Sequence, residues 1–431
     1  MKQNQSMDIQ EITTQMKADS YKMAALSLET RNNILKNIKE ALLKNQEAIF
    51  KANKMDMDAA EENGISAAVK KRLKFDEGKL SDVTQGIEEL IKLEDPIGKT
   101  QFKRQLDDGL ILQRINCPIG VIGIIFEARP DALVQISSLC IKSGNCAVLK
   151  GGKETTNTNK VLFQTIYQTA VESGAPAGCM YQAELHSEID ELLACHKSVD
   201  LLIPRGSNKF VQYIMNNTKI PVMGHADGIC HTYLDKDADI EKAVPIIVDA
   251  KTQYTAACNS TETLLVDRGI AKEVLVLIAE KLKEHKVKLH GTKEVAEIIS
   301  CVVMEEEEFN TEYLDLEISI KFVDGVDEAI EHINHFGSHH TDCIITENME
   351  TAEKFMQYVD SAGTYMNCST RFADGFRYGF GAEVGISTSK IHARGPVGLE
   401  GLTTYKYKLY GQGHIVDDYS KGKKQFHFCE L

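Results

Sequence analysis

The segment at residues 255–260, Thr-Ala-Ala-Cys-Asn-Ser, places the thiol of Cys258 among small side chains. Small neighbours would let a substrate carbonyl approach the sulfur, and backbone N–H groups of such a loop could stabilise an oxyanion. A nucleophilic thiol must be exposed, whereas most cysteines that catalyse nothing are small buried apolar residues. The segment alone therefore leaves both a covalent acyl chemistry and a packing role open.

Two glycine turns could bind a phosphate-bearing ligand. One is Lys150-Gly151-Gly152-Lys153, at the end of a predicted strand, and the other is Gly206-Ser207, which opens a predicted helix. Helix N-termini attract anions, and the lysines add positive charge. The alternative is a pair of ordinary turns with surface lysines. The chain has no GxGxxG motif after a strand, so a nicotinamide cofactor would have to be bound in another way.

Histidines gather at His332, His335, His339 and His340. The first pair has the spacing of one helical turn, but Gly337 interrupts the run and no cysteine or acid completes a set of ligands at zinc spacing. The sequence therefore predicts no metal site, and these histidines are interpreted as residues at a helix end and a strand start.

Composition limits the function classes. The chain has 431 residues, with 49 Lys and Arg against 63 Asp and Glu, for a formal net charge of −14. A net acidic surface repels nucleic acid and anionic membranes, so neither is expected as a partner. The eleven cysteines are scattered without a CxxC pair, and the polar N-terminus has no signal-peptide core. These features favour reduced thiols and a cytoplasmic location.

The elements that would position these residues follow an α/β pattern. Residues 8–95 read as helical because Ile34, Ile38 and Leu42 recur on one face, and residues 102–115 read as a hairpin around Asp108-Gly109. Strands and helices then alternate, which predicts parallel sheets in two α/β domains divided near residue 228. Tyr405, Tyr407 and Leu409 alternate in a predicted edge strand near the C-terminus.

Several longer motifs resemble one family, the gamma-glutamyl phosphate reductases of the aldehyde dehydrogenase superfamily. The resemblance runs over nearly the whole chain and depends on the joint order of the motifs. They are residues 117–123, 126–130, 149–154, 203–206, 224–228, 369–375 and 392–399, together with the Cys258 segment.

The resemblance implies an aldehyde dehydrogenase-like fold and three regions. A cofactor-binding domain with a five-stranded Rossmann-like sheet would comprise residues 1–97 and 118–228. A catalytic domain would comprise residues 229–399. Residues 98–117 and 400–431 would form a hairpin and C-terminal strand that mediate oligomerisation, with a homodimer or a higher homo-oligomer expected.

It also implies a reaction and its site residues. The activity would be the NADPH-dependent reduction of L-glutamyl 5-phosphate to glutamate 5-semialdehyde in proline biosynthesis, with Cys258 as nucleophile. The residues expected to bind the cofactor are Lys150, Lys153, Gly206, Ser207 and Glu317. The candidates for substrate binding are the four arginines of the matched motifs, Arg129, Arg371, Arg377 and Arg394. Transient contact with a glutamate 5-kinase is expected because glutamyl phosphate is labile.

Two departures from the wider superfamily refine these expectations. Hydrolytic relatives carry a glutamate where this chain has residues 224–228, Gly-His-Ala-Asp-Gly, and losing that base suits reduction over hydrolysis. Lys153 stands where a carboxylate often binds ribose, which favours the 2′-phosphate of NADPH. Another acyl reductase of the superfamily, such as a CoA-acylating aldehyde dehydrogenase, and a non-catalytic cofactor-binding scaffold remain as alternatives.

Overall fold

Two compact units make up the chain, and each is described by itself. The computed structural model describes residues 8–184, 187–225, 227–381 and 383–431. Unit 1 comprises residues 1–223, 381–385 and 397–431, and unit 2 comprises residues 224–380 and 386–396. Residues 1–7 of the predicted cofactor domain and Ala226 of the 224–228 motif lie outside the described residues.

Unit 1 contains a parallel sheet with the strand order β5-β4-β3-β6. The strands are β3 (Val121–Phe126), β4 (Cys146–Gly151), β5 (Met180–Ala183) and β6 (Leu201–Arg205). All six residues of β3 are buried, as the predicted apolar strand requires, because helices cover both faces of such a sheet. The expected five-stranded sheet is wrong for the described residues. Val222 makes only an isolated parallel bridge to Leu202, beside Pro221, which has no N–H to donate.

Helices surround this sheet, and the helical reading of residues 8–95 is confirmed. Ile34, Ile38 and Leu42 are fully buried, and Ser27 and Asp76 cap helix starts by accepting backbone N–H groups. The helices of unit 1 are α1 (Ile9–Ala25), α2 (Leu28–Lys44), α3 (Gln46–Glu62), α4 (Ala67–Leu73), α5 (Glu77–Lys92), α6 (Pro130–Lys142), α7 (Thr156–Glu172), α8 (Glu188–Ala194) and α9 (Asn208–Asn216), with the 3-10 turns η1 (Lys153–Thr155) and η2 (Ala177–Cys179).

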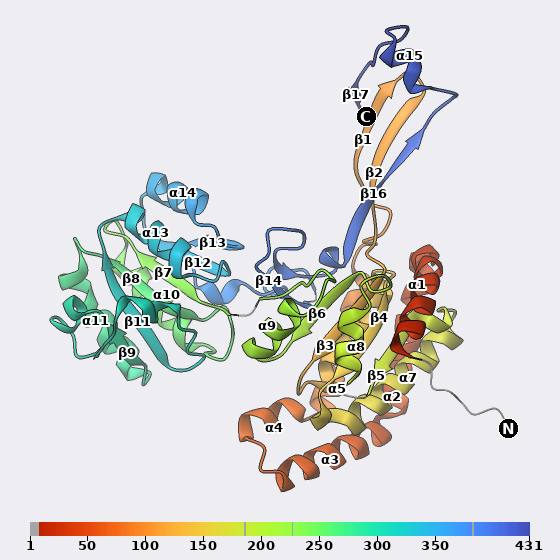
Figure 1. Cartoon of the computed structure of the whole chain (residues 1–431). Coiled ribbons are helices and arrows are strands. Elements are labelled where there is room, and N and C mark those ends of the chain that lie inside the picture. The colour runs from red at the N-terminus through yellow and green to blue at the C-terminus, as the bar shows by residue number, and fades with distance from the viewer. Residues whose placement is uncertain (1–7, 185–186, 226, 382) are drawn as a thin grey trace. The chain divides into compact units, whose positions relative to one another are not determined.

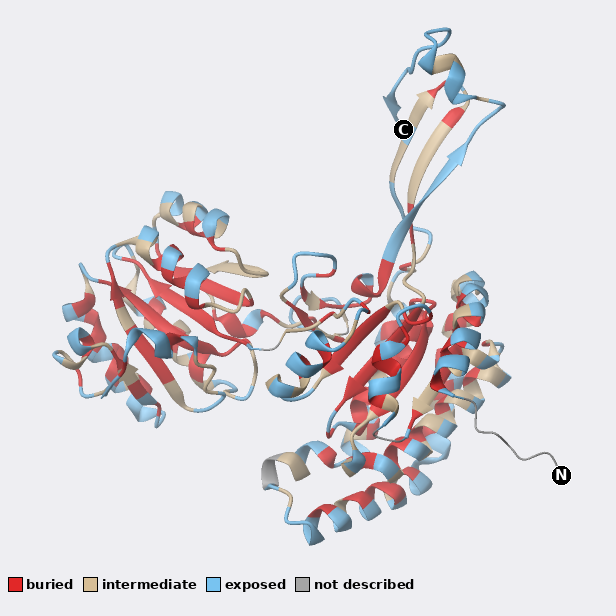
Figure 2. Ribbon diagram, in the orientation of Figure 1, coloured by how far each residue is buried: buried red, intermediate tan, exposed pale blue. Residues whose placement is uncertain are grey.

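A second sheet of unit 1 forms an arm that extends from the parallel sheet (Figure 1). Its order is β16-β2-β1-β17, from β1 (Thr100–Asp107), β2 (Leu110–Pro118), β16 (Thr403–Tyr410) and β17 (Cys429–Glu430). The predicted hairpin turn is confirmed, and Gly109 has the positive φ of 74° that such a tight turn needs. The arm also carries η5 (Glu400–Leu402) and α15 (Val416–Ser420), and its surface is mostly exposed (Figure 2).

Unit 2 contains a parallel sheet with the order β10-β9-β11-β8-β7-β12-β13. Its strands are β7 (Cys230–Leu234), β8 (Thr261–Asp267), β9 (Lys288–Gly291), β10 (Val302–Val303), β11 (Glu317–Val323), β12 (Thr341–Ile345) and β13 (Gly363–Met366). Its helices are α10 (Ile240–Thr252), α11 (Ala271–Glu284), α12 (Lys293–Ala296), α13 (Val326–Phe336) and α14 (Met349–Tyr358), with η3 (Glu306–Asn310) and η4 (Thr370–Phe372). The short strands β14 (Gly385–Ser387) and β15 (Gly395–Val397) pair with each other.

The core of unit 2 lies on both faces of its sheet, which Figure 2 shows as buried strands between helices. Successive side chains of β8 alternate between the faces: Leu264 and Val266 pack with α10 and α11, whereas Leu265 packs with α13 and α14. Both faces of the sheet are buried, and the strands carry buried polar residues, such as Glu262 and Asp342, among their apolar ones. No helix in the described part of the chain is long and apolar enough to cross a bilayer.

Candidate active site

The amino-terminal edge of the sheet in unit 2 collects residues that are far apart in the sequence. Strands β8, β7 and β12 are parallel neighbours, so the segments that enter them start at the same edge. Cys258 lies in the loop before β8, Gly228 lies just before β7, and His340 immediately precedes β12. The strand order thus brings a thiol, a glycine and an imidazole together.

Cys258 is the accessible thiol of this group. Its sulfur lies 3.2 Å from Nε2 of His340, and the residue is only half-buried. Cys230, also at this edge, is fully buried, and burial raises the pKa of its thiol well above the usual range. Since a thiolate is the reactive form, Cys230 is suited to packing, and Cys258 is the candidate nucleophile.

The loop that carries Cys258 is held at both ends by buried polar contacts. Lys251, at the end of α10, donates to the Glu262 carboxylate on β8 at 2.7 Å, and both side chains are completely buried. Between them, the side-chain amide of Asn259 donates to the carbonyl of Ala373 at 2.8 Å. The hydroxyl of Thr370 donates to the carbonyl of Asn259 at 2.7 Å. These contacts fix the loop that presents the sulfur.

Gly228 leaves room for this loop because it has no side chain. A Cβ atom there would lie 2.6 Å from both Cα and Cβ of Cys258, closer than unbonded carbons approach. The backbone N–H of Gly228 donates to Glu312 at 2.9 Å, which limits how far the glycine can move. A side chain at this position would therefore displace Cys258.

Replacing Gly228 with alanine is expected to lower kcat/KM by about a hundredfold while the chain still folds, because a shift of the nucleophile by an ångström misaligns attack. Steady-state kinetics and circular dichroism of the purified variant would measure both effects. Gly86→Ala is a matched control, since Gly86 is a helical glycine with open space around its Cβ position. Wild-type activity in Gly228→Ala would contradict the inferred contact.

Two of the four candidate arginines lie beside the Cys258 loop. Arg371 is buried, and its Nε donates to the side chain of Gln253 at 3.0 Å. Arg377 donates to the carbonyl of Arg371 at 2.7 Å. Burial lowers the pKa of Arg371, neighbouring Arg377 lowers it further, and the Cys258 sulfur opposes both effects. The Arg371 side chain thus lies beside the loop that presents the sulfur.

The other two arginines have different surroundings. Arg394 is in unit 2, where its guanidinium pairs with Asp360 at 3.1 Å. Arg129 is in unit 1, where it precedes α6 and lies 3.4 Å from Asp131. Arg371 thus contacts the Cys258 loop through Gln253, and Arg377 contacts Arg371 and lies 3.8 Å from Asp374. Arg394 and Arg129 instead pair with carboxylates elsewhere in their own units.

The predicted cofactor residues of unit 1 lie at the carboxyl-terminal ends of strands in its parallel sheet. From β3 the chain passes to β4 on one side and later to β6 on the other, and α/β proteins bind ligands at such a switch point. There Ser207 donates its N–H to Glu127 at 3.0 Å. A Cβ on Gly206 would lie 2.8 Å from the Glu127 carboxyl carbon. A glycine and a helix N-terminus are features that bind phosphates, and a nucleotide phosphate here would have to displace the Glu127 carboxylate from the N–H of Ser207.

The remaining predicted cofactor residues differ in exposure. Lys150, at the end of β4, is buried and donates to the carbonyl of Gly151 at 2.7 Å, and burial lowers its pKa. Lys153 is exposed at the start of η1. Glu317 is in unit 2, where Lys288 and His290 donate to its carboxylate at 2.9 and 2.6 Å. The Lys288 bond, then the His290 bond, lowers the pKa of Glu317.

The structure separates the histidines that the sequence groups together. His332 is buried between Phe309 and Phe336, and burial lowers its pKa to about 2. His339 contacts the carbonyl of Asp360. His340 instead lies beside Cys258 and His225. The rings of His225 and His340 pack edge-on, with their centroids 4.9 Å apart. Sequence reasoning missed His340 and His225 as site residues, because their proximity depends on strand order.

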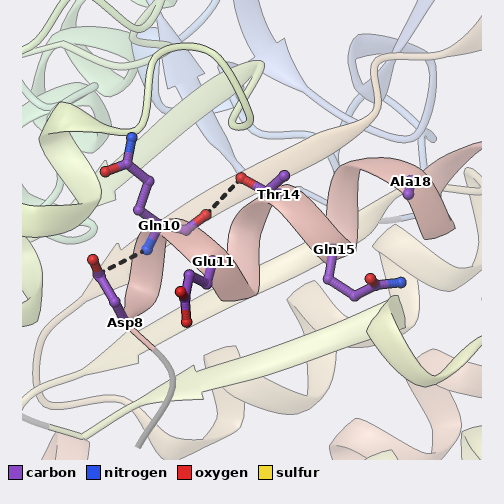
Figure 3. Close-up of a pocket in the computed structure, with 6 residues that line it drawn as sticks. All are labelled: Asp8, Gln10, Glu11, Thr14, Gln15 and Ala18. Atoms are coloured by element: carbon purple, nitrogen blue, oxygen red, sulfur yellow. Dashed lines mark hydrogen bonds between the residues drawn. The ribbon is translucent and has the colours of Figure 1, made fainter.

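A hollow on unit 1 has different chemistry. It lies along α1 and is lined by Asp8, Gln10, Glu11, Thr14, Gln15 and Ala18 (Figure 3). The N–H of Gln10 donates to Asp8, and the Thr14 hydroxyl donates to the Gln10 carbonyl, so these groups serve the helix itself. With two carboxylates and no cation among its six lining residues, the hollow does not suit a phosphate-bearing substrate.

The chain is similar in sequence and structure to members of one enzyme family. The sequence model of the Aldehyde dehydrogenase family matches residues 1–307. The chain is 55% identical over 420 residues to a gamma-glutamyl phosphate reductase of Acetivibrio thermocellus, covering 97% of each chain. The crystal structure of a gamma-glutamyl phosphate reductase of Thermotoga maritima matches with a TM-score of 0.93 and 38% identity, covering 95% of this chain and 100% of that one.

A more distant structure shows only the fold. An acetylating aldehyde dehydrogenase of Geobacillus thermoglucosidasius matches with a TM-score of 0.65 and 18% identity, covering 94% of this chain and 97% of that one. The aldehyde dehydrogenase-like fold expected from the sequence is confirmed by these matches.

Proposed function

Because this chain belongs to the gamma-glutamyl phosphate reductases of the Aldehyde dehydrogenase family, we propose that Cys258 is the nucleophile in an NADPH-dependent reduction of L-glutamyl 5-phosphate. The chain is an oxidoreductase of proline biosynthesis that acts on a small molecule. The products would be glutamate 5-semialdehyde and phosphate. The observation that carries the catalytic assignment is the half-buried Cys258 sulfur, 3.2 Å from the imidazole of His340, in a loop that Arg371 contacts through Gln253.

Residues of this chain would form the covalent intermediate and bind the substrate. The Cys258 sulfur attacks the acyl carbon, and the bond from that carbon to the phosphate oxygen breaks, which leaves a thioester on the protein. Arg371 and Arg377 would attract the anionic groups of the substrate. A bound reduced nicotinamide supplies the hydride that converts the thioester to the aldehyde. His225 stands in the motif where hydrolytic relatives place a glutamate base, so thioester hydrolysis would be slow.

The cofactor would be held by the residues at the switch point of unit 1. Gly206 and Ser207 would approach its pyrophosphate, and Lys150 and Lys153 would supply charge at the end of β4. Glu317, on the amino edge of unit 2, is proposed to bind the nicotinamide ribose. The fit is supported by the glycine cradle and by the helix N-terminus at the switch point.

Lys153→Glu is expected to lower the preference for NADPH over NADH, because a carboxylate repels the 2′-phosphate that a lysine attracts. The measurement is the ratio of kcat/KM for the two cofactors, which should fall by about tenfold, the effect of roughly 1.4 kcal/mol. Lys36→Glu makes the same charge change on the exposed face of α2 and should leave the ratio unchanged. An unaltered ratio in Lys153→Glu would remove Lys153 from the cofactor site.

The substrate assignment is tested by the reverse reaction. The wild-type enzyme should reduce NADP⁺ when given glutamate 5-semialdehyde and phosphate, and the rate should depend on phosphate. If coenzyme A replaces phosphate as the required acceptor, the chain is instead a CoA-acylating aldehyde dehydrogenase. If neither acceptor supports turnover while cofactor still binds, the chain is a non-catalytic scaffold.

The arm is proposed to join two copies of the chain. Strand β16 is an edge strand, and its residues 404–410 are exposed. Exposed apolar side chains on the arm are Tyr405, Tyr407, Leu409, Tyr410, Ile415, Val416, Phe426, Phe428 and Leu431. An apolar surface beside an unpaired strand edge favours association with another chain.

A charge on this edge is expected to dissociate the homo-oligomer. Leu409→Lys would place an ammonium group at the interface, so light scattering at micromolar concentration should give the monomer mass for the variant and a dimer or larger mass for the wild type. Tyr21→Lys, at an exposed position on α1, is the control and should keep the wild-type mass. A wild-type chain that is already monomeric would contradict the proposed interface.

The cellular location and a transient partner complete the proposal. All eleven cysteines lie in described residues and none forms a disulfide, which supports a reducing compartment such as the cytoplasm. The lability of an acyl phosphate supports transient contact with the glutamate 5-kinase that produces it.

A further inference from the structure

The imidazole of His340 is placed to receive a proton from the nucleophile. Its Nε2 lies 3.2 Å from the Cys258 sulfur, within hydrogen-bonding distance for a thiol. The two residues are 82 positions apart, and each is fixed independently, Cys258 by its clamped loop and His340 by its place before β12. A thiol needs a base or a positive field to react at neutral pH, and the superfamily's glutamate is missing from this chain.

The other ring nitrogen of His340 has a partner that can set the tautomer. Nδ1 lies 3.0 Å from the hydroxyl oxygen of Thr341 and 3.6 Å from the sulfur of Cys230. When the ring proton is on Nδ1 and makes a hydrogen bond to the Thr341 hydroxyl, Nε2 presents its lone pair to Cys258. Cys230 donates its own S–H to the carbonyl of Cys258 at 3.3 Å, so the buried thiol also supports this arrangement.

We propose that His340 is the catalytic base that deprotonates Cys258, and this inference rests on the proposed function. In acylation the S–H bond breaks and its proton moves to Nε2, while the sulfur forms a bond to the acyl carbon. The bond from that carbon to the phosphate oxygen breaks, its electron pair leaves with the phosphate, and the phosphate takes the proton from His340. After reduction the thiolate leaves the carbon with its electron pair, and a proton from solvent restores the thiol.

Other ionisable groups surround the ring of His340 and the Cys258 loop. Cys258, Cys230 and His225 pack against the ring, and Asp342, two residues along β12, binds His231 and Ser361 instead. His225 directs Nδ1 to the carbonyl of Ile386 at 2.8 Å. Around the loop, Arg371 adds positive charge and Glu312 accepts the N–H of Gly228. The Nε2 atom of His340 lies 3.2 Å from the sulfur, within hydrogen-bonding distance, and a ring nitrogen of His225 lies within 4.8 Å of it.

The test is the rate at which iodoacetamide alkylates Cys258, which needs neither substrate nor cofactor. His340→Gln keeps the size and polarity of the ring position but cannot act as the base, so the alkylation rate at about pH 7 should fall at least tenfold. At about pH 9.5, where cysteine ionises without help, the variant and the wild type should react at similar rates. His340→Asn is a second variant, and mass spectrometry of the peptide spanning residues 252–263 identifies the alkylated thiol.

His335→Gln, at an exposed position on α13, is the matched control and should react like the wild type. Equal alkylation of His340→Gln and wild type at about pH 7 would overturn the proposal. A deficit of the same size at both pH values would also overturn it, since that result indicates a purely structural role. Failure of the proposed function appears separately, as a wild-type enzyme with a reactive Cys258 but no phosphate-dependent turnover.

Discussion

Cys258→Ala is expected to reduce phosphate-dependent oxidation of glutamate 5-semialdehyde by at least about a thousandfold, because removing a nucleophile leaves only binding and oxyanion stabilisation. The fold should be intact, since the residue is half-buried and the loop is held by Lys251, Glu262 and Asn259 rather than by the sulfur. Initial rates of NADPH formation measure the loss, and cofactor binding should be unchanged.

A direct readout accompanies the kinetic one. Incubation of the wild type with glutamyl phosphate in the absence of NADPH should acylate the peptide spanning residues 252–263, and Cys258→Ala should not be labelled. Cys429→Ala removes an exposed thiol of the arm and should retain both the activity and the thioester. Activity retained by Cys258→Ala, or an acyl group found on another cysteine, would contradict covalent catalysis at this sulfur.

Local sequence patterns predict much of the fold. The hairpin around Asp108-Gly109 and the edge strand that carries Tyr405, Tyr407 and Leu409 form where their patterns predict. Patterns fail where few residues carry a signal. Helix α14 buries only Ala352 and Phe355, so its apolar stripe is too weak to identify, and β5 is four residues long. The predicted division near residue 228 lies close to the boundary at Met223, but the roles of the two units remain predictions.

The residues of the candidate site also differ in how far the sequence can identify them. Cys258 can be singled out because the evidence is local: a thiol among small residues before a strand. His340 cannot, because its contact with Cys258 exists only when β12 and β8 flank β7 in one parallel sheet. The sequence instead groups His340 with His332 and His335, neighbours in the chain that the fold directs elsewhere. Contacts between distant segments depend on strand order, which periodicity does not encode.

The largest expected effect on stability concerns the buried pair that holds the ends of the Cys258 loop. Lys251→Met should lower the free energy of unfolding by about 3–5 kcal/mol, because it leaves the Glu262 carboxylate buried without its cation. Glu262 then keeps the N–H of Leu314, at 3.4 Å, as a hydrogen-bond donor. Chemical denaturation of the full chain, monitored by circular dichroism, measures the change in the free energy of unfolding. Lys242→Met, on the same helix but in an exposed pair with Glu347, should cost less than about 1 kcal/mol.

The pH and a second substitution distinguish a lost charge from lost packing. Burial raises the pKa of Glu262 to about 7, and Lys251 opposes that shift, so the stability that Glu262 contributes is lost as the pH rises to about 7, and removal of Lys251 lets the shift go further. Lys251→Met should therefore be more destabilised at about pH 8 than at about pH 6. Adding Glu262→Met should restore most of the stability, because two apolar side chains of similar size replace the pair. If the double variant is no more stable than Lys251→Met, the pair does not hold the loop through its charges, and shape complementarity around α10 and β8 must do so instead.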